Sequence, residues 1–171
     1  MWKVNTSNAS KLAEFRKYLG EVEATPHDLE EPDADLYTVI QYKASQFEGV
    51  IVDDTSLEID GVAAGVNIRW LLETLDQHIG KRAEFTCLLG ICRGDQVSIF
   101  EGRTRGHIVA PCGDSFGFNN SFLPEGAERT FGEEIPDALN PRKLAIDALL
   151  AERPAKVLPS LKTWDGKFQS S

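Results

Sequence analysis

The chain has 171 residues, and its 18 basic and 27 acidic side chains give it a formal net charge of −9 at pH 7. This length suits one domain, with room for two lobes, and a chain of this size buries roughly 70% of its unfolded surface without a disulfide or a structural metal. The 42% of hydrophobic residues excludes a chain that is mainly disordered. The acidic balance, without a run of five like charges, argues against a protein that coats a nucleic-acid polymer, because phosphate backbones require clustered Lys and Arg.

The sequence carries no pattern typical of export or of a membrane segment. The N-terminal residues lack the charged and apolar regions of a signal peptide, and no apolar run reaches the ~18 residues that a membrane helix requires. Cys87, Cys92 and Cys112 are odd in number and lack the spacing of a metal site. We interpret them as inert thiols in a reducing compartment, and we therefore expect a cytoplasmic protein with no membrane partner.

The first third of the chain is predicted to alternate strands and helices. Apolar residues of the first helix recur at helical spacing, polar residues precede it, and Gly20 ends it. The predicted segments are, in order, a strand at 2–6, a helix at 9–19, a strand at 22–28, an acidic loop at 29–35, a helix at 36–47 and a short buried strand at 50–52.

Later in the chain the hydrophobic period changes. Alternating apolar residues predict a β-meander, and Asn140 followed by Pro141 is typical of a capped helix start. The order predicts an α/β protein with a mixed sheet, in which short polar loops at the strand ends form a cleft. The predicted segments are a helix at 68–75, strands at 84–92, 96–101 and 103–109 with turns at 93–95 and Gly102, a loop at 111–128, a helix at 140–151 and a partly extended tail from Pro154.

The polar segment Thr6–Lys11 joins a predicted strand to a predicted helix. Free backbone N–H groups at a helix start attract anions, and Thr6, Ser7 and Asn8 add neutral hydrogen-bonding side chains. Lys11 adds one positive charge a turn later. The segment is therefore a candidate phosphate loop, although it lacks the glycine pattern of a P-loop, and a plain capped helix is the alternative.

Two adjacent carboxylates, Asp53 and Asp54, follow the predicted strand at 50–52. Neighbours in an extended stretch point to opposite sides, so at most one of the two needs to face a given site while the other braces the loop. Carboxylates hold Mg²⁺ together with waters and substrate phosphates, and a carboxylate can take a proton from an attacking water. Glu31 in the acidic loop and Lys43 on the following helix would suit the same site. A solvated acidic turn and isolated surface charges are the alternatives.

Aromatic residues and an arginine mark a second candidate region. The segment Phe116–Phe122 places aromatic rings in a loop with glycine and asparagine, where a ring can stack on a base and an amide can bond to the base edge. Arg142 opens the last predicted helix, and its guanidinium suits phosphate or a base carbonyl. The alternatives are rings that fill the core and an arginine on the surface. The three histidines lack zinc spacing, and we assign none of them a catalytic role.

Taken together, these segments resemble one family, the inosine/xanthosine triphosphate pyrophosphatases, which are Ham1-like nucleotide hydrolases. The likeness extends over roughly residues 3–150, with its pieces in the family's order. It implies one pyrophosphatase domain over residues 1–171, with an elongated mixed sheet flanked by helices as in Maf-type α/β proteins, two lobes, a central substrate cleft and usually a homodimer. The matching pieces are the phosphate loop Thr6–Lys11, the acidic motif Val52–Leu57, the meander Phe100–Pro111 and the base-pocket segments Phe116–Asn119 and Thr130–Glu133.

The resemblance also implies a reaction and a set of residues. Family members cut a nucleoside triphosphate to the monophosphate and pyrophosphate with Mg²⁺, for which Mn²⁺ can substitute, and thereby remove non-standard purine nucleotides such as dITP, ITP and XTP. Asp54 would bind the metal and act as general base, while Lys11 and Lys43 would act on the phosphates. The implied metal ligands are Glu31, Asp54 and Asp53, and the implied substrate contacts are Thr6, Ser7, Asn8, Lys11, Lys43, Thr55, Arg69, Phe116, Phe118, Asn119 and Arg142.

Departures from the family pattern concentrate in the base pocket. Asn119 stands where the family usually has aspartate, Asn120 where it has proline, and Asn140-Pro141 where it has serine and histidine. Asparagine both donates and accepts, whereas an ionised aspartate only accepts, and an unpaired buried polar group costs about 1–3 kcal/mol. We therefore expect triphosphate hydrolysis with an open base preference. The alternatives are the same chemistry on a modified or pyrimidine nucleotide, and a nucleotide-binding relative without turnover.

Overall fold

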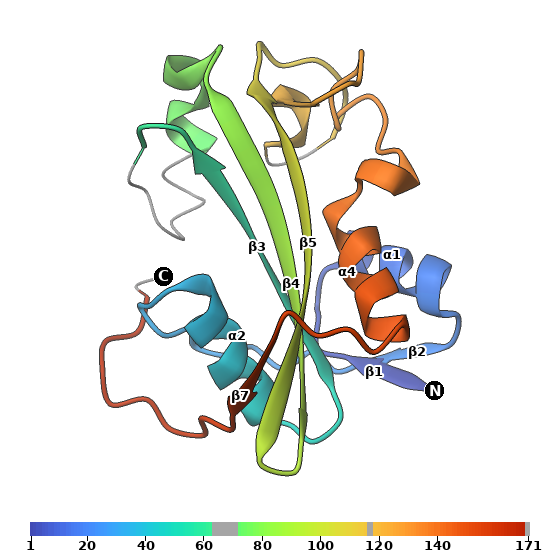
Figure 1. Cartoon of the computed structure of the whole chain (residues 1–171), viewed down its shortest axis with the longest axis vertical. Helices are drawn as coiled ribbons and strands as arrows, with labels where there is room; N and C mark the ends of the chain where they lie inside the picture. The colour runs from blue at the N-terminus through green and yellow to red at the C-terminus, as the bar shows by residue number, and fades with distance from the viewer. Residues whose placement is uncertain (63–71, 116–117, 170–171) are drawn as a thin grey trace. The chain divides into compact units, whose positions relative to one another are not determined.

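A computed structural model of the chain describes residues 1–62, 72–115 and 118–169 (Figure 1). The strands are β1 (Trp2–Val4), β2 (Val22–Ala24), β3 (Ile51–Ile59), β4 (Arg82–Arg93), β5 (Gln96–Ile108), β6 (Phe122–Pro124) and β7 (Lys156–Pro159). The helices are α1 (Ala9–Leu19), α2 (Leu36–Ser45) and α4 (Pro141–Leu150), and single 3-10 turns lie at Leu75–His78, Asn119–Ser121 and Asp137–Leu139.

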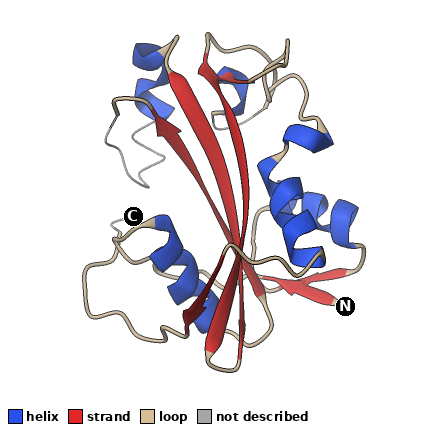
Figure 2. Cartoon of the chain, in the orientation of Figure 1, coloured by secondary structure: helices blue, strands red, loops and turns tan. Residues whose placement is uncertain are grey.

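The sheet is mixed (Figure 2). Its strand order within the described residues is β2-β1-β3-β4-β5-β6, and β7 lies beside β5. β1 pairs in parallel with β2 and with β3, whereas β5 pairs antiparallel with β6 and with β7. The predicted α/β fold with a mixed sheet is therefore confirmed.

The chain divides into two compact units. Unit 1 contains Met1–Asp54, Leu88–Glu101 and Ala145–Ser171, and unit 2 contains Thr55–Cys87 and Gly102–Leu144. The strands β3, β4 and β5 and the helix α4 contribute residues to both units, and each unit has a hydrophobic core of its own. The candidate metal ligands and lysines belong to unit 1, whereas the candidate base-binding residues belong to unit 2.

In unit 1, helix α2 covers one face of the sheet. Ile40 and Ala44 of α2 pack in one cluster with Val52 of β3. Gly90 of β4 permits this close approach, because a Cβ atom at that position would lie 2.5 Å from Cγ2 of Ile40. Lys43 precedes Ala44 on the same helix, so this packing also sets how close Lys43 lies to the sheet.

Helix α1, also in unit 1, has a defined start and end. The side chain of Asn8 accepts the N–H of Lys11 at 3.0 Å, which is the predicted cap. Gly20, with φ of 86°, donates its N–H to the carbonyl of Arg16 at 3.0 Å and ends the helix as predicted. Phe15 is fully buried and anchors the helix in the core. The first turn, which carries Lys11, is therefore held at both its cap and its packed face.

An aromatic cluster fills the core of unit 2. Phe85 makes edge-to-face contacts with Phe118, Phe122 and Phe131, at centroid separations of 4.7, 6.0 and 6.0 Å. Such pairs each add roughly 0.5–1.5 kcal/mol to the burial of the rings. Gly106 of β5 lets β6 approach, because a Cβ atom there would lie 2.3 Å from the carbonyl oxygen of Leu123.

Strand β3 is longer than the prediction of a strand at 50–52. Asp53 and Asp54 lie inside β3 rather than after it. The prediction was wrong because the two carboxylates interrupt the apolar run, although the run resumes with Leu57 and Ile59, which are both buried. The aspartates are therefore fixed by strand pairing, which is more rigid than the expected loop.

The meander also differs from the prediction. The strands expected at 96–101 and 103–109 are one strand, β5, and Gly102 is a buried strand residue rather than a turn. Part of the loop expected at 111–128 is the short strand β6, which pairs with β5. A glycine between two apolar runs predicts a chain reversal, but Gly102 continues a strand, as glycine can in a sheet interior.

The last predicted elements are confirmed where the structure describes them. Asn140 precedes α4, and its Oδ1 accepts the N–H of Arg142 at 3.0 Å, as expected of a helix cap. The tail from Pro154 contains β7 and is otherwise irregular. Half of the helix expected at 68–75, residues 68–71, lies outside the described residues, and residues 72–74 are helical as predicted. The cysteines are unbridged thiols. Across the described ranges, the helices lack the combination of length and apolar character that a membrane crossing requires.

Candidate active site

The ammonium group of Lys43 is the centre of the candidate site in unit 1. Its Nζ lies 3.3 Å from Oε1 of Glu31 and donates a hydrogen bond of 3.0 Å to the backbone oxygen of Asp53. Glu31 comes from the loop before α2, Lys43 from α2 itself, and Asp53 from β3. The structure therefore brings together residues from three segments that were expected to share one site.

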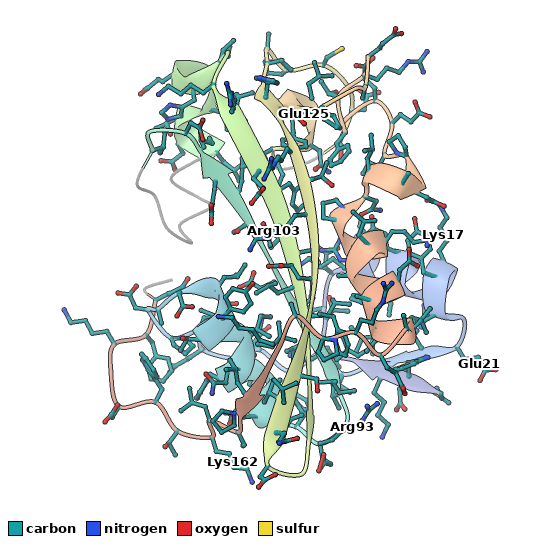
Figure 3. The ribbon with its side chains drawn as sticks, viewed as in Figure 1. Lys17, Glu21, Arg93, Arg103, Glu125 and Lys162 are labelled. Atoms are coloured by element: carbon teal, nitrogen blue, oxygen red, sulfur yellow. The ribbon has the colours of Figure 1, made fainter. Side chains whose placement is uncertain are left out.

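Burial sets Lys43 apart from most charged residues of unit 1. Lys17, Glu21 and Arg93 project from the surface (Figure 3). The side chain of Lys43 is only 13% exposed. A buried ammonium group requires anionic or carbonyl partners, because the loss of hydration otherwise favours the neutral amine.

The neighbouring carboxylates keep Lys43 charged. Burial acts to lower the pKa of Lys43, but the charges of Asp54, Glu31 and Asp53 act in the opposite direction, and the net result is a pKa raised above the ordinary value of 10.5. Lys43 is therefore fully protonated at neutral pH. A fixed positive charge beside carboxylates is an arrangement that suits both a phosphate group and a divalent cation.

Asp53 and Asp54 turn their side chains to opposite faces of β3, as predicted for neighbours in an extended chain. Asp53 is 4% exposed, and its Oδ2 lies 3.2 Å from Nζ of Lys11 on α1. Asp54 follows Val52 by two residues and so shares its face of the strand, which is the face that α2 and Lys43 cover. Asp54 is partly exposed. Asp54 is therefore the aspartate that lies on the side of Lys43.

The environment of Asp53 is that of a positioning residue. Its carboxylate pairs with Lys11, and its backbone oxygen accepts a hydrogen bond from Lys43. Removing one partner of a buried ion pair leaves the other charge uncompensated. We therefore interpret Asp53 as the residue that holds the two lysines in place, and its expected role as a metal ligand stays a prediction.

The segment Thr6–Lys11 forms a capped helix start, which was the alternative reading of its sequence. The N–H of Asn8 donates to Oγ1 of Thr6 at 3.1 Å, and the N–H of Lys11 donates to Oδ1 of Asn8 at 3.0 Å. Ser7 and Asn8 are exposed. A capped start retains other free N–H groups, so phosphate binding here is compatible with the geometry and stays a prediction.

In unit 2, Phe118 is a core residue. It is 8% exposed and packs edge-to-face on Phe85 at 4.7 Å. The ring of Phe118 therefore fills the core, which was the alternative interpretation of its sequence. Its stacking on a base stays a prediction. Phe116 lies outside the described residues.

Asn119 and Asn120 organise the loop that follows β5. Nδ2 of Asn119 donates to Oγ of Ser115 at 3.0 Å. Asn120 accepts the N–H of Ser115 at 2.9 Å and donates to the carbonyl of Ser115 at 3.0 Å. Gly132 lies so close to this clamp that a Cβ atom there would be 2.0 Å from Oδ1 of Asn120. Asn120 thus uses its side chain to bond to Ser115, a role that sequence reasoning missed.

The remaining predicted substrate contacts are spread over unit 2. Arg142 is 9% exposed in the first turn of α4, so the alternative of a surface arginine is wrong. Thr55 is partly exposed on β3. Arg69 lies outside the described residues.

Sequence reasoning also missed contacts that surround Glu31 and α2. The backbone oxygen of Glu31 accepts the N–H of Gln169 at 2.8 Å, and the hydroxyl of Tyr37 on α2 donates to Oε1 of Glu101 on β5 at 2.5 Å. Both contacts join segments far apart in the sequence. No local pattern marks either contact, so only a structure could reveal them.

The carboxylates around Lys43 fit a cation that completes its coordination with substrate. No group of three or more His, Cys, Asp and Glu side chains arranged to hold a metal occurs among the described residues. Mg²⁺ does not require one, since it is usually bound through one or two carboxylates together with waters and substrate phosphates. Glu31 and Asp54, which both act on the charge of Lys43, form such a pair of candidate ligands.

Comparison with known proteins places the chain in a family. The profile of the Ham1 family matches residues 3–152. A dITP/XTP pyrophosphatase of Pyrobaculum aerophilum is 31% identical over 173 aligned positions, which cover 86% of this chain and 92% of that protein. An inosine triphosphate pyrophosphatase of Yarrowia lipolytica is 34% identical over 178 positions, which cover 86% and 94%.

A solved structure agrees with this assignment at the level of the fold. The Ham1 protein of Staphylococcus aureus superposes with a TM-score of 0.71 at 20% identity, over 88% of this chain and 96% of that one. The family profile and the two sequence relatives each extend over most of the chain. The chain therefore belongs to the Ham1 family.

Proposed function

We propose that this protein hydrolyses a nucleoside triphosphate to the monophosphate and pyrophosphate, and that it acts on non-standard purine nucleotides such as dITP, ITP and XTP. The observation that carries the proposal is the cluster in which protonated Lys43 lies against Glu31 on the side of β3 that carries Asp54. The names of the sequence relatives, a dITP/XTP pyrophosphatase and an inosine triphosphate pyrophosphatase, support the same reaction. This reaction would remove damaged nucleotides from the pool that polymerases use.

We further propose that the reaction depends on Mg²⁺, with Mn²⁺ as a possible substitute. Glu31 and Asp54 would hold the cation, whose positive charge would offset the negative charge of the substrate phosphates. The carboxylate oxygens of Glu31 and Asp54 support this proposal, because Mg²⁺ prefers oxygen ligands of this kind. Lys43 keeps its proton beside these carboxylates and supplies a positive charge that does not depend on the metal.

In this mechanism Asp54 accepts the proton of the attacking water. The water oxygen forms a bond to the α-phosphorus, and the bond from the α-phosphorus to the bridging oxygen breaks, so that pyrophosphate leaves. Lys43 donates hydrogen bonds to the phosphates and stabilises the charge that develops on the leaving group. Lys11 adds a second positive charge, whose position the buried carboxylate of Asp53 fixes at 3.2 Å.

We propose that Asn119 contributes to the base preference. Asn119 is partly exposed in a loop whose shape the clamp from Asn120 to Ser115 maintains. The amide of Asn119 can donate to one base edge atom or accept from another, so it can recognise bases that an aspartate would reject. The substrate with the highest kcat/KM in a panel would identify the base.

Two further properties belong to the same proposal. We propose a homodimer, which the resemblance to the family supports, and sedimentation velocity would test it. We also propose a cytoplasmic protein, which is supported by the reaction itself, since nucleotide pools are used where nucleic acids are made. Fluorescence microscopy of the tagged full chain in its own host would test the location.

The activity is tested with a panel of dITP, XTP, dGTP, dATP, dUTP and dCTP, with Mg²⁺ and with EDTA. The expected result is release of pyrophosphate, not of orthophosphate, with dITP and XTP preferred and with EDTA abolishing turnover. Preference for another base would retain the chemistry and overturn the proposed substrate. Tight binding of a nucleotide without any release of pyrophosphate would overturn the proposed reaction.

A further inference from the structure

The C-terminal residues beyond the family match form part of unit 1. The Ham1 profile ends at residue 152, yet the chain continues with β7 and an irregular segment that ends beside α2, drawn in red in Figure 1. We call residues 160–169 the C-terminal strap. It contacts both α2, which carries Lys43, and the loop that carries Glu31.

The first half of the strap is bound to α2 by side chains of that helix and of its C-cap. Just before the strap, Gln41 donates to the carbonyl of Pro159, the last residue of β7, at 2.8 Å. Within the strap, the N–H of Leu161 donates to Oγ of Ser45 at 2.8 Å. Gln46 donates to the carbonyl of Lys162 at 3.2 Å. Figure 3 shows Lys162 at this part of the strap, and its side chain is exposed. The backbone of the strap is therefore fixed along one side of α2.

The second half of the strap pairs with the loop that carries Glu31. Gln169 donates its N–H to the carbonyl of Glu31 at 2.8 Å, and Asp33 donates its N–H to the carbonyl of Lys167 at 2.8 Å. These two bonds frame an antiparallel bridge between Pro32 and Phe168. The side chain of Gln169 adds a hydrogen bond of 3.1 Å to the carbonyl of Pro32.

The ring of Phe168 anchors this pairing on the helix. It packs edge-to-face on Tyr42 of α2, with ring centroids 5.9 Å apart. Tyr42 directly precedes Lys43, so the strap reaches the helix turn that carries the ammonium group. Among the described residues, the backbone hydrogen bonds that join 28–34 to another segment all go to 167–169. The loop of Glu31 has no helix or strand of its own to fix it.

We infer that Phe168 and Gln169 are positioning residues that hold Glu31 at the metal and phosphate site beside Lys43. The inference rests on the proposed function, because it takes Glu31 as a ligand of the cation. Groups that orient a metal ligand typically change metal affinity or activity by about 10–100-fold when they are removed. The strap acts on the ligand through its backbone, and it lies outside the part of the chain that the family profile covers.

The test compares three variants of the full chain with one matched control. Phe168→Ala removes the ring that packs on Tyr42, and Gln169→Ala removes the side-chain bond to Pro32. Phe168→Tyr keeps the ring and is expected to retain wild-type behaviour. Thr163→Ala is the control, because Thr163 is an exposed residue of the same strap. These point variants keep β7 and the contacts from α2, so folding does not depend on a truncation.

The first readout needs no nucleotide and no turnover. Binding of Mn²⁺ is measured by electron paramagnetic resonance, and amide hydrogen exchange is followed over residues 28–34. Phe168→Ala is expected to weaken Mn²⁺ binding about tenfold and to speed exchange in this loop, because Asp33 loses its acceptor when the strap separates. Thr163→Ala and Phe168→Tyr are expected to match the wild type in both measurements.

The second readout distinguishes a positioning role from a general loss of folded structure. In Phe168→Ala the Mg²⁺ concentration for half-maximal pyrophosphate release is expected to rise about tenfold, while KM for the nucleotide at saturating Mg²⁺ stays within about twofold. In a Glu31→Gln background the same substitution is expected to change the Mg²⁺ dependence no further, because the ligand is already lost.

The outcomes distinguish this inference from the proposed function. Unchanged Mn²⁺ binding and unchanged exchange over 28–34 in Phe168→Ala would overturn the role of the strap, whether or not the enzyme is active. Weaker Mn²⁺ binding and faster exchange would support it even if no tested nucleotide is hydrolysed. An equal loss in Thr163→Ala would also overturn it, because the effect would then not depend on contact with the loop of Glu31.

Discussion

Replacing Lys43 by methionine removes the positive charge of the unit 1 site and keeps a side chain of similar length. At 3.3 Å and an effective dielectric constant of about 20, the attraction between Lys43 and Glu31 is about 5 kcal/mol before any loss of hydration is subtracted. Breaking a fully buried pair costs about 3–5 kcal/mol, but Glu31 is 33% exposed, so solvent screens part of the effect. We therefore expect Lys43→Met to lower the free energy of unfolding by about 2 kcal/mol at neutral pH.

The same substitution has a defined pH dependence. Because the fold raises the pKa of Lys43, the stabilisation by this residue is fully present below the unfolded value of 10.5 and is lost only as pH rises through the higher folded value. The difference in stability between wild type and Lys43→Met is therefore expected to show no change from the titration of Lys43 between pH 7 and 9. Loss of that difference would begin only in strongly alkaline solution.

Urea unfolding followed by tryptophan fluorescence measures this difference. Lys3→Met is the matched control, since Lys3 is an exposed lysine on β1 and its removal is expected to change stability by no more than about 0.5 kcal/mol. Lys43→Met is also expected to lower kcat about a hundredfold, because it removes a donor to the developing charge. Equal stability of Lys43→Met and Lys3→Met would refute the claim that the carboxylates of Glu31, Asp53 and Asp54 depend on this charge.

Two further predictions concern positions where the backbone is constrained. Gly90→Ala is expected to lower the free energy of unfolding, measured in urea, by about 1–2 kcal/mol, because the new Cβ would lie 2.5 Å from Cγ2 of Ile40 and push α2 away. A stability equal to that of the wild type would contradict this prediction and show that α2 shifts freely. Glu152 has φ of 55° at the end of α4, so Glu152→Gly is expected to raise stability by about 0.5–1 kcal/mol in thermal unfolding, whereas Glu152→Ala is expected to give no gain. A gain with alanine equal to that with glycine would contradict the strain argument.

The local parts of the fold could be predicted from the sequence because their signals lie within a few residues. Asn8 and Gly20 delimit α1 as expected, and Asn140 precedes α4, since caps are recognised by side-chain type and spacing. The end of β3 could not be found in this way. Sheet pairing continues through Asp53 and Asp54, and pairing depends on neighbouring strands rather than on local hydrophobicity.

The candidate site was predictable in composition but not in arrangement. Glu31 and Lys43 were expected together and lie 3.3 Å apart, and the opposite orientation of Asp53 and Asp54 follows from strand alternation. The pairing of Lys11 with Asp53 rather than with Asp54 depends on which helix covers which face of the sheet. Such a choice is made by tertiary packing, so no spacing in the sequence indicates it.

Residues whose sequence pattern fits either of two roles were the hardest to predict. An aromatic ring in a glycine-containing loop can fill a core or stack on a base, and the sequence pattern of Phe118 is the same in both cases. The structure places it against Phe85 in the core of unit 2. The contact of Gln169 with Glu31 joins residues far apart in the sequence, and contacts at such separations leave no periodic signal.

The most direct test of the account compares wild type with Asp54→Asn in the release of pyrophosphate from dITP with saturating Mg²⁺. The substitution preserves shape and removes the proton acceptor, which is also a candidate metal ligand, so the rate is expected to fall about a thousandfold. Asp60→Asn, at an exposed aspartate just after β3, is the matched control and is expected to keep the wild-type rate. A near-wild-type rate in Asp54→Asn would contradict the assignment of Asp54 as the general base and with it the proposed mechanism.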